Sequence, residues 1–126
     1  VLLQLLPELA PLLFDFSKQW RSDLRVFMEN NFLSDMSVEQ FAHFAGRSLS
    51  TFKREFVKIF EQTPHQWILD KRLEYARKLL ESRKYPLSEV YLKAGFKNPT
   101  HFATCFKKRY GLTPSDAFSR LENTYD

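Results

Sequence analysis

The chain has 126 residues, enough for one domain with a substantial core, and 44% of them are hydrophobic. Its net charge is +4, and the basic excess lies after residue 36, because residues 1–36 carry three basic and five acidic side chains. The single cysteine, Cys105, excludes an internal disulfide and a cysteine-rich zinc site and fits a reducing compartment, while the basic body favours a polyanionic partner.

The first 16 residues, VLLQLLPELAPLLFDF, are apolar but contain two prolines and three polar side chains. We expect one or two short helical pieces, since the segment has the features of neither a secretory signal nor a membrane span. Because the chain starts at Val1, we expect a fragment in which residues 1–21 are a linker or remnant. This apolar segment either joins an absent upstream domain or a second subunit, or packs as a flap on the domain's own core.

A helix to about Asn31 follows, with Ser22 or Asp23 as its cap. The first predicted unit covers about residues 37–61. Ser37 and Gln40 have the form of a capping box, which predicts a short helix that Gly46 ends in a left-handed conformation. We expect Val38, Phe41, Phe44 and Ala45 on its inward side. A second helix runs from about Leu49 to Phe60 and buries Phe52, Phe56, Ile59 and Phe60.

The joining helix is predicted over residues 64–83, with Pro64 at its first position. Leu69, Leu73, Ala76 and Leu80 have the spacing of a buried stripe. Glu74 and Lys78 are spaced as an i,i+4 ion pair on the opposite side.

The chain after this helix repeats the chain before it. Ala45-Gly46 recurs as Ala94-Gly95 with an offset of 49, and Thr63-Pro64 recurs as Thr113-Pro114 with an offset of 50. The aromatic stripe Phe52, Phe56 and Phe60 recurs as Phe102, Phe106 and Tyr110, also with an offset of 50. These matches predict a duplicated unit over about residues 87–111, with a second helix Pro99–Tyr110 and a last helix from Pro114.

A short helix, a glycine turn and a second helix with a polar outer face form a helix-turn-helix. Such a second helix fits a DNA major groove, which is about 12 Å wide, and its early residues reach deepest. The joining helix is about 30 Å long, close to the roughly 34 Å between successive major grooves, so one chain could read two grooves of an asymmetric site. Candidate base-reading residues are Ser50, Lys53, Arg54, Asn98, Pro99, Thr100, His101 and Thr104. Candidate phosphate contacts are Arg47, Lys97, Lys107 and Lys108.

The residues over about 22–121 resemble the C-terminal DNA-binding domain of AraC/XylS-type bacterial transcription regulators. The matching segments are Gly46 to Phe56, Arg72 to Leu80, Ala94-Gly95-Phe96, Phe102, Phe106-Lys107-Lys108, Gly111-Leu112-Thr113-Pro114-Ser115 and Phe118. The resemblance implies about seven helices, a preceding regulatory or dimerisation domain, RNA polymerase as a partner and activation of transcription.

Three departures from the family pattern stand out. Arg47 replaces an aromatic, Ser119 replaces an arginine, and Pro99 and Ala103 replace longer polar residues. We therefore expect fewer base contacts from the second unit than from the first.

Nothing in the sequence indicates catalysis or a cofactor. His43, His65 and His101 share no ligand spacing, so a metal site is not expected, and Cys105 suits a small core residue. We expect a cytoplasmic, non-enzymatic transcription regulator that binds double-stranded DNA without contact with a membrane. The alternative is a helical protein–protein interaction module whose helix-turn-helix core is not used on DNA.

Overall fold

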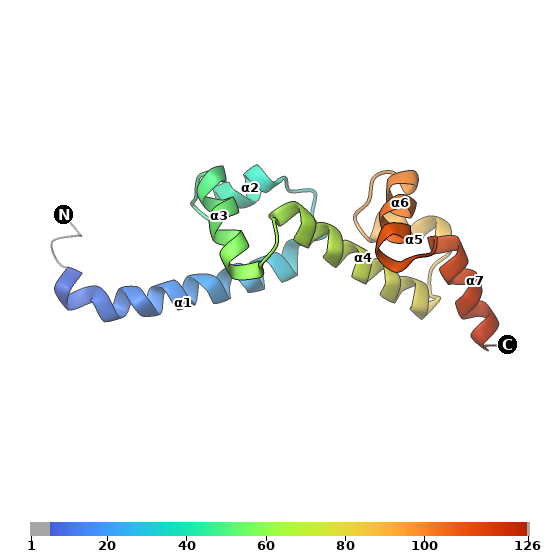
Figure 1. The fold of residues 1–126 in the computed structure, drawn as a ribbon, viewed down its shortest axis with the longest axis horizontal. Coiled ribbons are helices and arrows are strands. Elements are labelled where there is room, and N and C mark those ends of the chain that lie inside the picture. Colours follow the sequence, from blue (N-terminus) through green and yellow to red (C-terminus); the bar gives the residue numbers. More distant parts are fainter. Residues whose placement is uncertain (1–5, 126) are drawn as a thin grey trace.

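The computed structural model describes residues 6–125, and the side-chain environment of residues 18–120. This part of the chain is all α-helical and elongated, with α1 and α7 at opposite ends and α4 between two compact groups (Figure 1). The predicted all-α fold with two helix-turn-helix units on a joining helix is confirmed. The helices are α1 (Leu6–Asn31), α2 (Val38–Phe44), α3 (Leu49–Phe60), α4 (Pro64–Ser82), α5 (Leu87–Lys93), α6 (Pro99–Tyr110) and α7 (Pro114–Tyr125).

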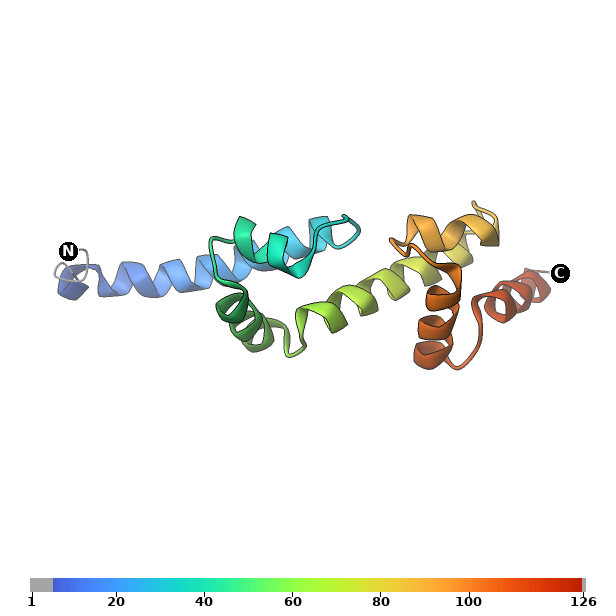
Figure 2. The ribbon, with the colours of Figure 1, turned by 90° about the horizontal axis from the view of Figure 1, so that it is seen from above.

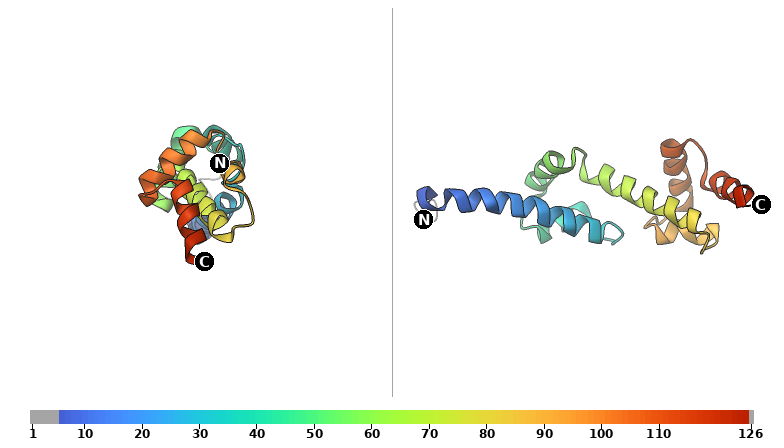
Figure 3. Two further views of the ribbon diagram at one scale, coloured as in Figure 1. Left: turned by 90° about the vertical axis from the view of Figure 1, so that its right-hand side faces the viewer. Right: turned by 90° about the horizontal axis from the view of Figure 1, so that it is seen from below.

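The predicted helix start at Ser22 or Asp23 is wrong, because α1 is one helix of 26 residues that begins at Leu6. Pro7 lies in its first turn, where a missing N–H costs nothing, and Pro11 removes one hydrogen bond from a helix long enough to tolerate the loss. The N-terminal half of α1 extends away from the other helices (Figure 3). Residues 1–5 and the side chains up to residue 17 lie outside the described part of the structure. Whether the apolar segment joins another domain or subunit, or packs as a flap on the core, therefore stays a prediction.

The first unit packs α1, α2, α3 and the start of α4 around one core. Leu24 and Met28 of α1 meet Phe41, Phe52, Phe56 and Trp67 in this cluster. The expectation that Phe44 faces inward is wrong, because 71% of its surface is exposed. The buried side of α2 is formed by Val38, Phe41 and Ala42, which leaves Phe44 off that face.

The second unit packs α5, α6 and α7 around the C-terminal half of α4, with Leu80, Val90, Phe102 and Phe106 in its core. The two helix-turn-helix turns have the same backbone hydrogen bonds. The amide N–H of Gly46 donates to His43 O and that of Arg47 to Ala42 O, while Gly95 donates to Leu92 O and Phe96 to Tyr91 O. Gly46 and Gly95 have φ of +69° and +88°, the left-handed values expected where each first helix ends. This common geometry supports the duplication.

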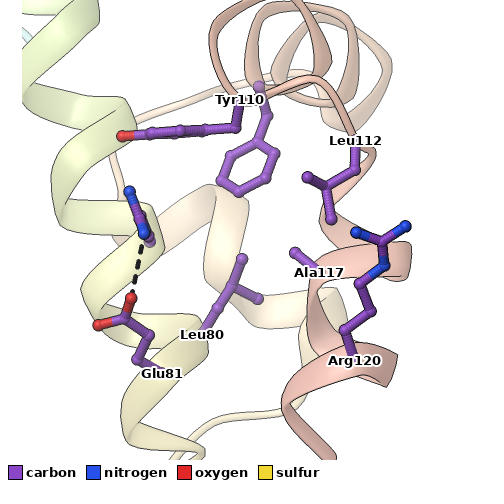
Figure 4. Close-up of a pocket in the computed structure, with 8 residues that line it drawn as sticks. Leu80, Glu81, Tyr110, Leu112, Ala117 and Arg120 are labelled. Carbon is purple, nitrogen blue, oxygen red and sulfur yellow. Dashed lines mark hydrogen bonds and ion pairs between the residues drawn. The ribbon is translucent and has the colours of Figure 1, made fainter.

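A pocket of about 280 Å³ lies between α4, α6 and α7 (Figure 4). Leu80, Phe106 and Leu112 give it apolar walls, and Glu81 pairs with Arg77 at 3.2 Å on its rim. Phe106 belongs to the buried stripe of α6, so the pocket lies behind that helix and away from its exposed face. Over residues 6–125, no helix combines the length and the apolar content that crossing a membrane requires.

Candidate nucleic-acid interface

Helices α3 and α6 lie on the same side of the molecule. Seen from above, both occupy the lower side, whereas α2 and α5 lie on the upper side (Figure 2). Each buries its aromatic stripe, Phe52 and Phe56 in α3 and Phe102 and Phe106 in α6, and leaves the opposite face exposed. The arrangement therefore places two helices that each have an exposed face on the same side of the molecule.

In α3, the predicted base-reading side chains form one exposed stripe. Ser48 caps the helix by accepting a hydrogen bond from the Thr51 amide, which holds the first turn in place. Ser50, Lys53 and Arg54 are exposed, and their spacing puts them on one face. Within the described residues no hydrogen bond or ion pair engages Lys53 or Arg54. Both cationic groups are thus available to acceptors on a partner.

In α6, the corresponding polar groups are more engaged. The Asn98 side chain caps the helix, accepting hydrogen bonds from the amides of Thr100 (2.8 Å) and His101 (3.1 Å). Pro99 occupies the first helical position, which needs no N–H. The Thr104 hydroxyl donates to Thr100 O at 2.9 Å, and the His101 ring nitrogens lie 3.7 Å from Cys105 Sγ. All five predicted base-reading residues of this unit are exposed, but Asn98 and Thr104 already have local partners.

The predicted phosphate contacts divide into two kinds. Lys97, Lys107 and Lys108 are exposed at the two ends of α6. Arg47 has internal partners instead: its Nε lies 3.2 Å from Glu55 Oε2, and its guanidinium sits 4.3 Å from the centre of the Trp20 ring. Arg47 thereby connects α1 to α3 in addition to any contact it makes with a ligand.

Arg72 of α4 holds the two units in a fixed relation, a role that the sequence analysis missed. Its guanidinium donates hydrogen bonds to Phe32 O (2.8 Å) and Ser34 O (2.9 Å), which precede the first helix-turn-helix, and to Gly95 O (3.1 Å) in the turn of the second. Burial lowers the pKa of Arg72, and the nearby Asp35 carboxylate offsets part of that shift. One side chain thus joins three backbone carbonyls from both halves of the domain.

A second arginine fixes the far end of α6 on α4. Arg109 pairs with Asp70 at 2.9 Å and with Glu74 at 3.0 Å. The Asp70 carboxylate also accepts hydrogen bonds from the side chains of Gln62 (2.7 Å) and Gln66 (2.9 Å). The expected pair of Glu74 with Lys78 is replaced by this contact, because Arg109 reaches Glu74 from another helix. Arg72 and Arg109 together tie the turn and the last helical turn of the second helix-turn-helix to α4, and Arg72 also ties α4 to the loop after α1.

Known proteins share both the sequence pattern and the fold. A helix-turn-helix domain family model matches residues 41–120. The virulence regulon transcriptional activator VirF of Yersinia enterocolitica is 35% identical over 94 residues, which are 75% of this chain and 35% of VirF. The HTH-type transcriptional regulator ExsA of Pseudomonas aeruginosa is 30% identical over 109 residues, which are 86% of this chain and 39% of ExsA. The chain therefore spans little more than a third of the length of these relatives.

Solved structures of DNA-binding domains have the same fold as this chain. The DNA-binding domain of AdpA, a global transcriptional factor crystallised with a target DNA, superimposes with a TM-score of 0.76 at 25% identity, over 82% of this chain and 94% of that one. An AraC-type regulator from Chromobacterium violaceum has the same fold, with a TM-score of 0.71 at 23% identity over 85% of this chain and 96% of that one.

Proposed function

This chain belongs to the AraC/XylS-type family of helix-turn-helix DNA-binding transcription regulators, and from that premise we propose that α3 and α6 enter two successive major grooves of one duplex. The observation that carries this proposal is the location of α3 and α6, each with one buried and one exposed face, on one side of the molecule. Helix α4, which joins the two units, has 19 residues and is about 28 Å long, comparable to the roughly 34 Å between successive grooves. The family consists of transcription regulators, so the prediction that this domain is not an enzyme is confirmed.

We further propose that α3 supplies most of the sequence preference. Arg54 and Lys53 suit the O6 and N7 acceptors of guanine, and Ser50 can contact either base of a pair. The hydroxyl of Thr104 and the amide oxygen of Asn98 are engaged within α6, which supports a smaller reading role for that helix. Lys97, Lys107 and Lys108 would bind phosphates and position the domain.

The roles of the whole regulator extend beyond this domain. VirF is named as a transcriptional activator, and we propose activation for this protein as well. An activator acts through RNA polymerase, and we propose that a regulatory or dimerisation domain is joined to α1. A DNA-binding regulator of this kind works in the bacterial cytoplasm, where its DNA is.

Selection of bound duplexes from a random pool tests the proposal directly. We expect an asymmetric site with two preferred segments one helical turn apart, and an affinity that falls steeply with salt because phosphate contacts release counterions. Arg54→Ala should weaken the preference for one G·C pair in the segment bound by α3 by about 1–3 kcal/mol. We expect a smaller loss of preference in the segment bound by α6 when Thr100, His101 and Thr104 are all replaced by Ala. Salt-insensitive binding without preference over random duplex would favour a protein–protein module instead.

A further inference from the structure

Val57 is an exposed apolar residue on the face of α3 that is otherwise polar or charged. With 44% of its surface exposed, it is one of few large hydrophobic side chains on the outside of the described domain. Successive helical residues are rotated by about 100°, so Ser50, Lys53, Arg54 and Val57 form one i, i+3, i+4, i+7 stripe. Homeodomain recognition helices contact bases with this spacing.

Packing does not explain an apolar residue at this position. The duplication places Lys107 of α6 at the position equivalent to Val57, and Lys107 is exposed as well. The core beneath α3 is formed instead by Phe52, Phe56 and Ile59. Since the fold accepts a lysine at the equivalent position, the packing of the domain does not require an apolar side chain here, and Val57 is available to a partner.

The major groove offers one apolar group to such a side chain, the C5-methyl group of thymine. Valine suits it, because its β-branched side chain has a single strongly preferred rotamer in a helix and loses little freedom on contact. We propose that Val57 reads a thymine methyl group in the segment bound by α3, an inference that rests on the proposed function.

The position of this thymine is constrained by the neighbouring arginine. Val57 follows Arg54 by three residues, a rise of about 4.5 Å along the helix. Successive base pairs are about 3.4 Å apart. The thymine read by Val57 therefore lies within about two base pairs of the G·C pair at which Arg54→Ala relaxes the preference.

Exchanging thymine for deoxyuridine, which lacks only the methyl group, tests the contact. The duplex selected by the unmodified protein is synthesised with each nearby thymine replaced in turn. At one position we expect about fourfold weaker binding by the unmodified protein, which corresponds to the burial of one methyl group. The Val57→Ala variant should bind the duplex with thymine and the duplex with deoxyuridine at that position with equal affinity. It should still distinguish thymine from deoxyuridine at any position where that preference depends on Ser50.

The equivalent position in α6 supplies the controls. Val57→Lys should lose the discrimination and steepen the dependence of log affinity on log salt by about 0.9, whereas Lys107→Val should flatten it by about 0.9. Thermal unfolding of each variant checks that the fold is kept. The inference is overturned if the unmodified protein and Val57→Ala discriminate equally at every thymine. Failure of the selection to yield any preferred site would instead refute the proposed function.

Discussion

Replacing Arg72 with Met keeps the apolar part of the side chain and removes its three hydrogen bonds to Phe32, Ser34 and Gly95. A hydrogen bond that involves a charged group contributes about 1.5–3 kcal/mol, so three would give about 4.5–9 kcal/mol if fully buried. Arg72 is half-buried, water reaches the carbonyls that lose their donor, and the cost of desolvating the guanidinium disappears. We therefore expect a loss of about 2–4 kcal/mol in the free energy of unfolding, or roughly 10 °C in Tm.

Two assays show whether Arg72→Met loosens the connection between the two units or only lowers the stability of the whole domain. Urea unfolding gives the stability, with Lys78→Met as control, because Lys78 is an exposed cation of the same helix without a contact among the described residues. Binding to the selected duplex, with and without two extra base pairs between its segments, measures how firmly the units are held. Arg72→Met should bind the correct spacing more weakly and show a smaller penalty for the insertion. An unfolding free energy within about 0.5 kcal/mol of the unmodified protein's, with an unchanged insertion penalty, would refute this role for Arg72.

Three further predictions concern single contacts. Gly95→Ala should lower the free energy of unfolding in urea by about 1–2 kcal/mol more than Gly46→Ala does. Both glycines have positive φ, but only at Gly95 would an added Cβ lie 3.0 Å from Arg72 Nε. Equal losses of stability in the two variants would contradict this contact. Arg47→Met should lower stability by about 1 kcal/mol through its contacts with Glu55 and Trp20 and leave the salt dependence of DNA binding unchanged. A salt slope flatter by about 0.9 would instead support the phosphate contact expected from the sequence. Asn98→Ala should cost about 1 kcal/mol by removing the cap of α6, and Asn98→Ser should keep most of that stability; unchanged stability in Asn98→Ala with a lost base preference would make Asn98 a reader instead.

The features that sequence predicted correctly have local causes. The bounds of α3 and α6 follow from their aromatic stripes and turn residues, and the capping box of Ser37 with Gln40 is present as predicted. Gly46 and Gly111 have the left-handed conformation that ends a helix. Each of these signals lies within a few residues of the feature it predicts.

The features that sequence missed depend on distant contacts. Arg72 binds carbonyls 38 and 40 residues earlier, and a backbone acceptor leaves no trace in the residue type that carries it. A signal was nevertheless present, because helical geometry puts Arg72 in the same sector of α4 as the buried Ile68, Ala76 and Leu79. A cation within an apolar sector indicates a specific acceptor. The engagement of Glu74 by Arg109 had no such signal, since Lys78 was an equally good local partner.

The uninterrupted α1 has a mechanical consequence. The same rod that reaches out past the domain supplies Leu24 and Met28 to the layer directly beneath α3. Because α1 is one uninterrupted helix from Leu6 to Asn31, it forms a stiff connection between its far end and that layer. A displacement of its far end would therefore be transmitted to the packing under α3, the first of the two helices that we propose enter the DNA.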